Sequence, residues 1–372
     1  MENNPLRKVG ILGQSIWFDY IRRDLIVSGD LGRLIENDGL RGMTSNPSIF
    51  EKAIAGSHDY DEEIRALVLE GKDVNTIYET LSQRDVRSAA DEFQPVYKKT
   101  KGTDGYVSLE VNPHLAHDTR GTLEEAHRLW AALNRPNILI KIPATLEGLP
   151  VIEQLISEGI NVNVTLLFGI PRYQQVVKAY LAGLEGQSNH GKSIKTTASV
   201  ASFFISRIDT MVDPMLEKIM TKGGKEAELA KTLHGQIAIA SAKKAYQIYK
   251  ENIGSGRFKK LQNKGARAQR LLWASTSTKN LEYSDVKYVE SLIGADTINT
   301  LPVETMDAYR NHGEPEARIE QEMGNARRML EQLPELSIDI DKVTQQLEDE
   351  GIEKFNQSFD KLMETLKKAM GK

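Results

Sequence analysis

The sequence contains no cysteine, and aromatic residues make up only 6% of its 372 residues. The absence of cysteine excludes disulfide bonds, zinc sites built from thiolates and a cysteine nucleophile. Apolar runs are short: none approaches the roughly 18 residues of a membrane-spanning helix, so we expect no membrane partner. The first residues, Met1–Pro5, are polar and acidic and lack the pattern of a signal peptide. These absences favour a cytoplasmic protein.

Positive charge is not concentrated anywhere in the chain. Lys and Arg number 48 against 52 Asp and Glu, which gives a formal net charge of −4 and a pI of about 6.1. No block of about five or six basic residues occurs, so we expect no nucleic-acid partner. The length of 372 residues suits one α/β barrel enlarged by insertions.

Short apolar segments followed by turn residues have the pattern of buried parallel strands. They are 13–19, 40–45, 106–111, 137–142, 160–167, 196–202, 270–276 and 296–301. Amphipathic helical patterns fill most of the intervals, among them 122–134, 147–157, 171–185, 227–250 and 284–293. This alternation predicts a closed (β/α)8 TIM barrel. An open doubly wound sheet is the alternative, but no glycine-rich nucleotide turn follows the first strand.

Two parts of the chain exceed the needs of a plain barrel. The interval 50–105 reads as two or three helices inserted between the second and third strands. The segment 315–372 is charged, with helical patterns at 316–333 and 341–370, and we interpret it as an extension packed on the barrel. The prediction is therefore a single domain over 1–372.

One lysine stands inside an apolar strand. Lys141 follows Ile138-Leu139-Ile140 and precedes Ile142. Lysine is rarely buried unless its amine is paired or neutral, because burial disfavours the charged form. A neutral amine is a nucleophile that forms a Schiff base with a carbonyl group. The alternative is a lysine that extends from the strand end to water.

Polar side chains also gather where the first five predicted strands end, which is where active sites form in such barrels. They are Asp19, Thr44, Asn46, Glu110, Lys141, Asn161, Asn163 and Thr165. Each alone has an ordinary explanation, such as a helix cap or a turn. Together they predict one polar cup that contains an amine, two carboxylates and several neutral hydrogen-bonding groups.

The ends of the sixth and seventh strands are suited to binding an anion. Ser202 to Arg207 follows the sixth strand, and Ser275 to Asn280, which includes Lys279, follows the seventh. Hydroxyl groups, helix N-terminal amides and a fixed cation together can hold a phosphate. Ordinary helix capping, with Arg207 in a surface ion pair, is the alternative.

Two other patterns are weaker. Gly186 to Ser193 matches the phosphate-loop pattern G-x-x-x-x-G-K-[ST], but a predicted helix precedes it and a strand follows, the reverse of the required context. We interpret it as a surface turn. His114 and His117 would suit the metal of a metal-dependent aldolase, but their spacing is common by chance and we expect no metal site.

At these residues the chain resembles the transaldolase family, in particular its larger bacterial subgroup. The lysine strand and the Asn-x-Thr strand are the most specific of the matching motifs, which cover the whole predicted barrel. The motifs are Thr44–Ser48, Leu109–Val111, Ile140–Thr145, Asn163–Phe168, Ser202–Arg207 and Ala274–Asn280.

The resemblance implies a class I enzyme of the pentose phosphate pathway that needs no cofactor or metal. It would transfer a dihydroxyacetone unit from sedoheptulose 7-phosphate or fructose 6-phosphate to an aldose phosphate. Lys141 would form the Schiff base, Asp19 would be the general acid and base, and Glu110 with Thr165 would hold a proton-shuttling water. The resemblance further implies substrate binding by Thr44, Asn46, Asn163 and Ser202, and phosphate binding by Arg207, Ser277 and Lys279.

The chain departs from the family pattern at two positions. The family often has arginine where this chain has Lys279, and lysine lacks the bidentate geometry of arginine. The seventh-strand alignment needs one extra residue, so Ser275 is an alternative to Ser277. A class I aldolase that releases free dihydroxyacetone and a non-catalytic sugar-phosphate-binding barrel stay open as other functions. The sequence indicates neither the oligomeric state nor the preferred donor and acceptor.

Overall fold

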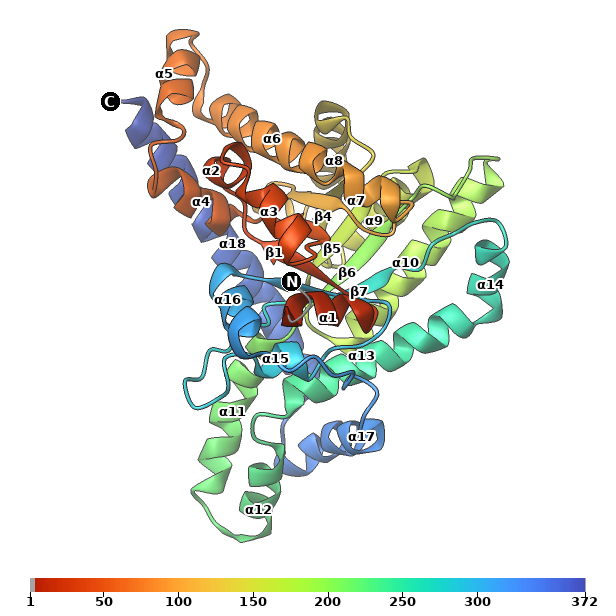
Figure 1. Cartoon of the computed structure of the whole chain (residues 1–372). Helices are drawn as coiled ribbons and strands as arrows, with labels where there is room; N and C mark the ends of the chain where they lie inside the picture. Colours follow the sequence, from red (N-terminus) through yellow and green to blue (C-terminus); the bar gives the residue numbers. More distant parts are fainter. Residues whose placement is uncertain (1–3, 372) are drawn as a thin grey trace.

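Parallel strands close into a barrel, and the helices pack around it (Figure 1). A computed structural model describes residues 4–371, in which the strands pair in chain order and β8 returns to β1. This confirms the predicted (β/α)8 TIM barrel. The strands are β1 (Gln14–Asp19), β2 (Gly42–Thr44), β3 (Tyr106–Glu110), β4 (Ile138–Pro143), β5 (Val162–Leu167), β6 (Ser199–Phe204), β7 (Arg270–Ala274) and β8 (Thr297–Leu301).

The helices follow the strands or fill the longer intervals between them. They are α1 (Pro5–Ile11), α2 (Arg23–Val27), α3 (Asp30–Asn37), α4 (Pro47–Ala55), α5 (Asp61–Leu69), α6 (Val74–Glu92), α7 (Gln94–Lys99), α8 (Thr119–Leu133), α9 (Gly148–Glu158), α10 (Ile170–Asn189), α11 (Ser206–Met220), α12 (Gly224–Leu233), α13 (Ile237–Gly254), α14 (Gly256–Gln262), α15 (Lys287–Glu290), α16 (Val303–His312), α17 (Met323–Gln332) and α18 (Ile340–Met370). Two short 3₁₀ turns, η1 (Pro113–Leu115) and η2 (Leu333–Leu336), complete the described elements.

Several helix boundaries differ from the predicted ones. The predicted helix 227–250 is two helices, α12 and α13, because Gly235 has a φ of +67° and turns the chain between them. The predicted helix 284–293 is helical only in α15, and the predicted helix 316–333 begins as α17 only after Glu322. Between β2 and β3 the chain forms α4, α5, α6 and α7, more helices than the two or three predicted.

The register of the strands brings the polar residues into rows. Glu110 is paired with Lys141, Lys141 is paired with Asn163, and Asp19 is paired with Thr44. Because directly paired residues of parallel neighbours lie on the same face of a sheet, these side chains share one side of the barrel wall. Period two then places Val162 and Val164 on the opposite face of β5, where they join the outer core.

An apolar cluster fills the barrel interior on the N-terminal side of these polar rows. Trp17 and Leu139, each two residues before Asp19 and Lys141, belong to it. Gly42 on β2 is necessary for this packing, because a Cβ there would lie 2.5 Å from the Trp17 indole. The cluster consists of Trp17, Tyr106, Leu139, Ala198, Val200, Leu272, Ala274 and Ile298.

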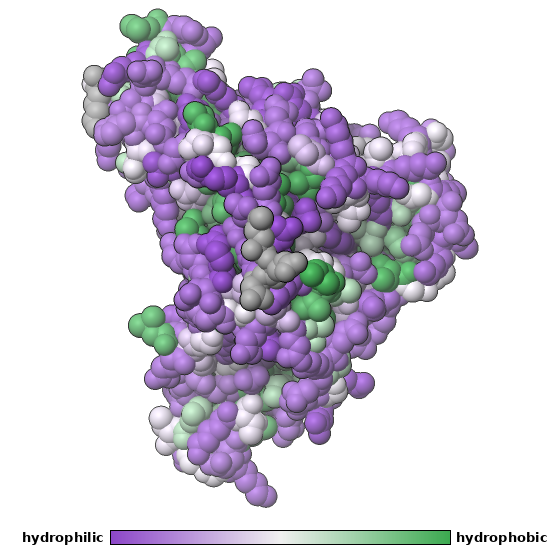
Figure 2. Space-filling model, viewed as in Figure 1, coloured by the Kyte–Doolittle hydropathy of each residue, from purple (hydrophilic) through white to green (hydrophobic). Residues whose placement is uncertain are grey.

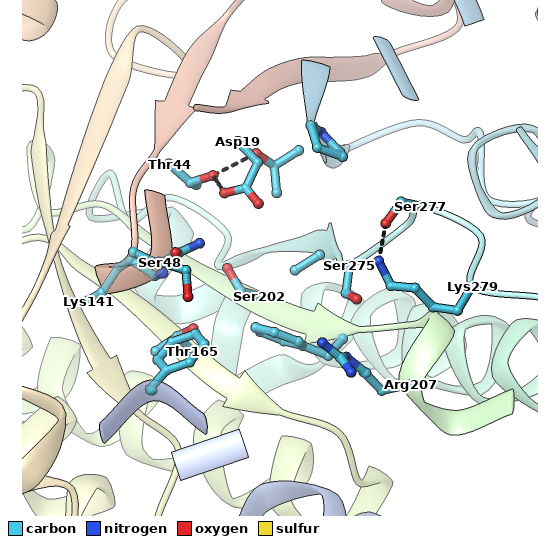
Figure 3. Close-up of a pocket in the computed structure, with 16 residues that line it drawn as sticks. Asp19, Thr44, Ser48, Lys141, Thr165, Ser202, Arg207, Ser275, Ser277 and Lys279 are labelled. Carbon is cyan, nitrogen blue, oxygen red and sulfur yellow. Dashed lines mark hydrogen bonds between the residues drawn. The ribbon is translucent and has the colours of Figure 1, made fainter. Parts of the chain in front are cut away.

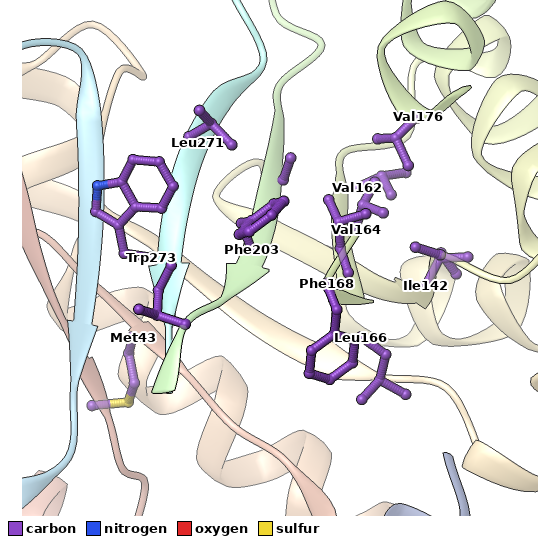
Figure 4. Packing of buried hydrophobic residues seen from close by; sticks show 14 of the residues in the cluster. Met43, Ile142, Val162, Val164, Leu166, Phe168, Val176, Phe203, Leu271 and Trp273 are labelled. Carbon is purple, nitrogen blue, oxygen red and sulfur yellow. The ribbon is translucent and has the colours of Figure 1, made fainter. Parts of the chain in front are cut away.

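A larger apolar core lies between the strands and the helices around them. Figure 4 shows part of it, with Phe203 of β6 and Trp273 of β7 beside Val162 and Val164 of β5 and Val176 of α10. Burying side chains of this size contributes about 1.5–3 kcal/mol each, so this layer is the main support of the barrel. The face in Figure 2 is mostly hydrophilic with separate hydrophobic patches. Within residues 4–371, the helices are all too short or too polar to span a membrane.

The long helix α18 runs beside α4 (Figure 1) and reaches the barrel mouth. Ser48 and Ser358 share a hydrogen bond of 2.7 Å between the two helices, and the Lys361 amine lies 3.0 Å from the Glu51 carboxylate. Closer to the barrel, a Cβ on Gly351 would lie 3.1 Å from a methyl carbon of Leu166 on β5. The glycine therefore allows α18 to lie directly against the end of that strand.

We predict that Gly183→Ala destabilises the protein, because α9 and α10 pack closely at this residue. An added Cβ would lie 2.7 Å from the Glu153 carbonyl oxygen and 2.7 Å from Ile156. Overpacking of this kind costs about 1–3 kcal/mol of unfolding free energy, measurable by urea unfolding. Gly324→Ala in α17 is the control, because no atom lies within 4 Å of its added Cβ. Equal stability of the Gly183 variant and the unchanged protein would contradict the prediction.

Candidate active site

A cavity of about 250 Å³ opens at the C-terminal ends of the strands (Figure 3). Most of the predicted site residues line it: Asp19, Thr44, Asn46, Lys141, Thr165, Ser202, Arg207, Ser277 and Lys279. Two predicted residues that do not line it lie directly behind the wall. Glu110 contacts Lys141, and Asn163 contacts Ser202. The structure therefore brings these residues to one place. Asn161, which the sequence also assigned to the polar cup, is the exception: it lies just before β5 at the N-terminal end of that strand, where its amide donates to the Pro136 and Ile138 carbonyl oxygens.

Lys141 stands on β4 with only 5% of its surface exposed. Its amine donates hydrogen bonds to the Ser45 carbonyl oxygen at 3.0 Å and to Glu110 Oε2 at 3.1 Å. Burial raises the pKa of Glu110; the Lys141 amine opposes that shift and Asp19 adds to it. A buried carboxyl with a raised pKa beside an amine is equipped to give and accept protons.

Asp19 ends β1 and receives a chain of hydrogen bonds. The Thr44 hydroxyl donates to Asp19 Oδ1 at 2.7 Å and lies 2.7 Å from the Thr300 hydroxyl, which leaves Thr300 as the donor to Thr44 (Figure 3). Burial raises the pKa of Asp19, while the Thr44 hydrogen bond and the Lys141 and Lys279 amines act in the lowering direction. Asp19 thus meets the condition for a general base, a carboxylate whose pKa lies above its usual range.

The fifth strand supplies two polar side chains, of which one is hydrogen bonded and the other has no partner within residues 4–371. Asn163 is fixed on both sides, because it donates to Ser108 Oγ at 3.0 Å and accepts from Ser202 Oγ at 2.7 Å. The buried hydroxyl of Thr165 lines the cavity and has no hydrogen-bond partner among the described residues. A buried hydroxyl without a partner is costly, which makes Thr165 available for a bound molecule. The next residue, Leu166, has a φ of +53° at a bulge in β5.

The other end of the cavity is cationic. Arg207 is the second residue of α11, and Lys279 lies in the loop after β7, where its amine donates to Ser277 Oγ at 2.6 Å (Figure 3). Partial burial and the nearby Arg207 guanidinium lower the pKa of Lys279. Two cations that repel each other favour an anion between them. Ser275 also lines the cavity, so the structure places both candidate serines of this loop at the site.

Sequence reasoning missed the contribution of α18. Phe355 lines the cavity, and its ring centroid lies 5.9 Å from the Lys141 amine. Its position far along the chain, in an amphipathic helix, gave no signal that it belongs to the site. Ser48, Phe204 and Thr300 also line the cavity; the first two lie within matching motifs, and Thr300 lies within the eighth predicted strand, but none was singled out as a site residue. Asn46 has a second role, because its side chain accepts from Ile49 N at 3.0 Å and so caps α4.

The two weaker sequence patterns lie elsewhere. Gly186 to Asn189 end α10, and a turn leads from there to β6, so the glycine-rich segment has the reversed context that the sequence predicted. His114 is hydrogen bonded to Asp360 at 2.8 Å, and His117 to Glu147 at 3.1 Å. Over residues 4–371 the side chains form no group of three or more potential metal ligands.

Fold and site together define a class of protein. It is a closed barrel that carries a buried lysine amine beside two carboxyl groups at one end of a cavity, and two cations at the other end. Such a cavity suits a carbonyl compound with an anionic group several atoms away.

Comparison with known proteins gives the family. The model of the family described as Transaldolase/Fructose-6-phosphate aldolase matches residues 16–366, and the chain belongs to this family. It is 49% identical to "Transaldolase" of Trichodesmium erythraeum, with 100% of this chain and 99% of that protein covered. It is 48% identical to "Transaldolase 2" of Nostoc punctiforme (98% and 97% covered) and 44% identical to "Transaldolase" of Mycolicibacterium smegmatis (98% and 97% covered). These matches confirm the resemblance predicted from the sequence motifs.

Proposed function

We propose that the chain is a transaldolase, which transfers a dihydroxyacetone unit from sedoheptulose 7-phosphate or fructose 6-phosphate to glyceraldehyde 3-phosphate or erythrose 4-phosphate. The observation that carries the proposal is the buried Lys141 amine, which faces the cavity and contacts Glu110 at 3.1 Å. Arg207 and Lys279, which also line this cavity, suit the terminal phosphate of such a sugar.

The reaction begins when the Lys141 ammonium group gives a proton to Glu110 and the freed amine attacks the ketone carbon of the donor. Water leaves as the carbinolamine becomes a protonated imine, which then withdraws electrons from the adjacent carbon–carbon bond. Glu110 and Thr165 hold a water that moves protons to and from the nitrogen and oxygen atoms in this step. The raised pKa of Glu110 and the unpartnered hydroxyl of Thr165 support these roles.

Cleavage of the carbon–carbon bond requires a base that accepts the proton of the hydroxyl group on the carbon that departs. Asp19 accepts the proton of the substrate hydroxyl, the carbon–carbon bond breaks, and the electron pair forms an enamine with the Lys141 nitrogen. The shortened aldose phosphate then leaves. The enamine then attacks the carbonyl carbon of the acceptor, and Asp19 returns its proton to the new hydroxyl. Water hydrolyses the resulting imine, which releases the new ketose phosphate and frees Lys141.

The remaining polar groups bind rather than react. Asn46, Thr44 and Ser202 hold the hydroxyl groups of the three-carbon unit from the cavity wall, and Asn163 supports this binding from behind the wall by fixing Ser202. Arg207, Ser277 and Lys279 bind the phosphate by charge and hydrogen bonding. No cofactor or metal takes part in these steps. The proposed substrates are the only partners assigned.

We predict that borohydride with fructose 6-phosphate inactivates the enzyme by reducing the imine on Lys141. Peptide mass spectrometry should find a three-carbon label on that residue, since cleavage precedes reduction. Lys141→Arg keeps a cation beside Glu110 but forms no imine, and it should stay unlabelled. The buried Lys243 and the half-buried Lys287 are internal controls in the same sample. Active, unlabelled protein after treatment would contradict the Schiff-base mechanism.

Transfer and release distinguish a transaldolase from a simple aldolase. With fructose 6-phosphate and erythrose 4-phosphate together, we expect sedoheptulose 7-phosphate to form much faster than free dihydroxyacetone. The physical reason is that the enamine stays bound to Lys141 until an acceptor aldehyde arrives. Coupled assays of the two products measure the ratio. Release at the rate of donor consumption would favour the aldolase, and absence of both products would favour a binding protein.

The pH profile tests the role of Asp19. Thr44→Val removes a hydrogen bond that lowers the pKa of Asp19, so the pKa of that residue rises further. Because cleavage needs the ionised carboxylate, the acidic limb of kcat should move to higher pH. Steady-state rates measured across the acidic limb of the pH profile give the size of the shift.

Two variants control this measurement. Thr300→Val removes the partner of Thr44 but no contact of Asp19, and it should shift the limb less. Asp19→Asn should reduce kcat by about 10²- to 10⁴-fold, the usual loss when a general acid and base is removed. If the acidic limb of kcat lies at the same pH in Thr44→Val as in the unchanged protein, the limb reports the ionisation of another group, such as Glu110.

A further inference from the structure

The loop between β7 and α15, residues 275–286, carries cavity residues but little regular structure of its own. Ser275, Ser277 and Lys279 of this loop line the cavity. Its internal bonds are turn contacts, such as Thr278 Oγ1 to Ser284 O at 2.7 Å. An exposed loop held only in this way would not fix a lysine side chain, because a flexible four-carbon stem loses much entropy on binding.

Tyr283 anchors this loop to α11. Its hydroxyl donates to Asp213 Oδ2 at 2.7 Å, and the other oxygen of Asp213 accepts from Gly235 N at 2.8 Å. Asp213 is 5% exposed, so its carboxylate depends on these partners. Burial and the Asp213 carboxylate raise the pKa of Tyr283, so the hydroxyl stays protonated and remains a donor.

Lys287 holds the ring of Tyr283 from one face. Its amine lies 3.4 Å from the ring centroid, within the range of a cation–π contact. The same amine donates to the Gly235 carbonyl oxygen at 2.6 Å and lies 3.7 Å from Asp209 Oδ2. Tyr288 completes the cluster by donating to Asp209 Oδ2 at 2.8 Å. The tyrosine is therefore fixed at its hydroxyl and at its ring.

Gly235 permits this arrangement. Its φ is +67°, and a Cβ on this residue would lie 2.6 Å from the Tyr283 hydroxyl and 2.8 Å from the Lys287 amine. Any larger residue would displace both side chains. The break between α12 and α13 therefore places a residue without a side chain against Tyr283, the tyrosine that anchors the loop.

The cluster connects the two cations of the cavity. Arg207, Asp209 and Asp213 stand on the same helix, α11. That helix holds Arg207 directly and, through Asp213 and Tyr283, also holds the loop that carries Lys279. Lys279 lines both the main cavity and a smaller one of about 160 Å³, whose wall includes Asp213 and Tyr283.

We infer that Tyr283 is a positioning residue for phosphate recognition: bound to Asp213 and stacked by Lys287, it fixes Lys279 and Ser277 relative to Arg207. This inference rests on the phosphate role that the proposed function gives to Arg207 and Lys279. Tyr283 does not line the main cavity, so it acts only through the loop.

The test is Tyr283→Phe, which removes the hydroxyl bond and keeps the ring under Lys287. We expect the KM for erythrose 4-phosphate to rise about tenfold, because small misplacements of binding groups have effects of this order. We expect kcat, and the KM for unphosphorylated D-glyceraldehyde, to change by less than about twofold, because the reacting groups are untouched. The inhibition constant of inorganic phosphate should rise in parallel with the KM for erythrose 4-phosphate.

A double-mutant cycle separates positioning from general loosening. In a Lys279→Ala background, Tyr283→Phe should raise the KM for erythrose 4-phosphate much less than it does in the unchanged protein, since only Ser277 is left for it to position. Additive effects would overturn the inference. Leu281→Ala is the control in the same loop, because Leu281 is fully exposed and should leave both KM values unchanged.

Gly235→Ala is the second variant and changes no residue of the loop. It should reproduce the selective rise in the KM for erythrose 4-phosphate. If Arg207→Ala and Lys279→Ala raise that KM while Tyr283→Phe and Gly235→Ala do not, the inference fails and the proposed phosphate site stands. If none of the four raises it, the phosphate site itself is misassigned. Equal losses for D-glyceraldehyde and erythrose 4-phosphate would show only a structural role and would also overturn the inference.

Discussion

The contact between Lys141 and Glu110 inside the barrel mouth is the constraint on which the rest of the site depends. An isolated ammonium group at 5% exposure would be strongly disfavoured, so the strand register must bring an acceptor beside it. The pairing of Glu110 with Lys141 does this through the backbone, without help from flexible loops. Because a buried ion pair seldom adds stability, its presence is better explained by reactivity than by folding.

This arrangement divides the barrel into layers with different tasks. The apolar cluster around Trp17 and Leu139 fills the interior, and the outer core around Phe203 and Trp273 supports the wall. The polar rows at the strand ends can then hold costly groups, such as the unpartnered hydroxyl of Thr165. The charges in the cavity are also separated, with carboxyl groups near the Lys141 amine and cations near α11. This separation of charge orients a phosphorylated sugar before any bond forms or breaks.

The sequence predicted the parts of this protein that follow from local rules. Strand periodicity and the motif around Lys141 were enough for the barrel and for most of the cavity wall, because parallel strand ends converge whatever the loops do. Helix ends were less predictable, since the break at Gly235 depends on Tyr283 and Lys287, which are distant in sequence. Phe355 was not foreseen for the same reason: only tertiary packing brings α18 over Lys141.

The roles of individual residues, the single-domain organisation and the cytoplasmic location are predictions of a different kind. Residue roles depend on reacting molecules, so the positions of Asp19 and Glu110 support their assignments without testing them. The single-domain organisation and the cytoplasmic location also stay predictions. In contrast, periodicity alone predicted that a helix precedes Gly186 to Ser193 and a strand follows, the opposite of the order in a phosphate loop. That prediction required only the order of the helix and the strand.

The position of α18 in the chain imposes an order of events during synthesis. All of the barrel strands leave the ribosome before Phe355 does, and the helix then settles where Gly351 meets Leu166. Phe355, which lies 5.9 Å from the Lys141 amine, is thus the last residue of the cavity wall to be synthesised. A chain that ended before α18 would keep every strand of the barrel but would leave this amine without its aromatic cover.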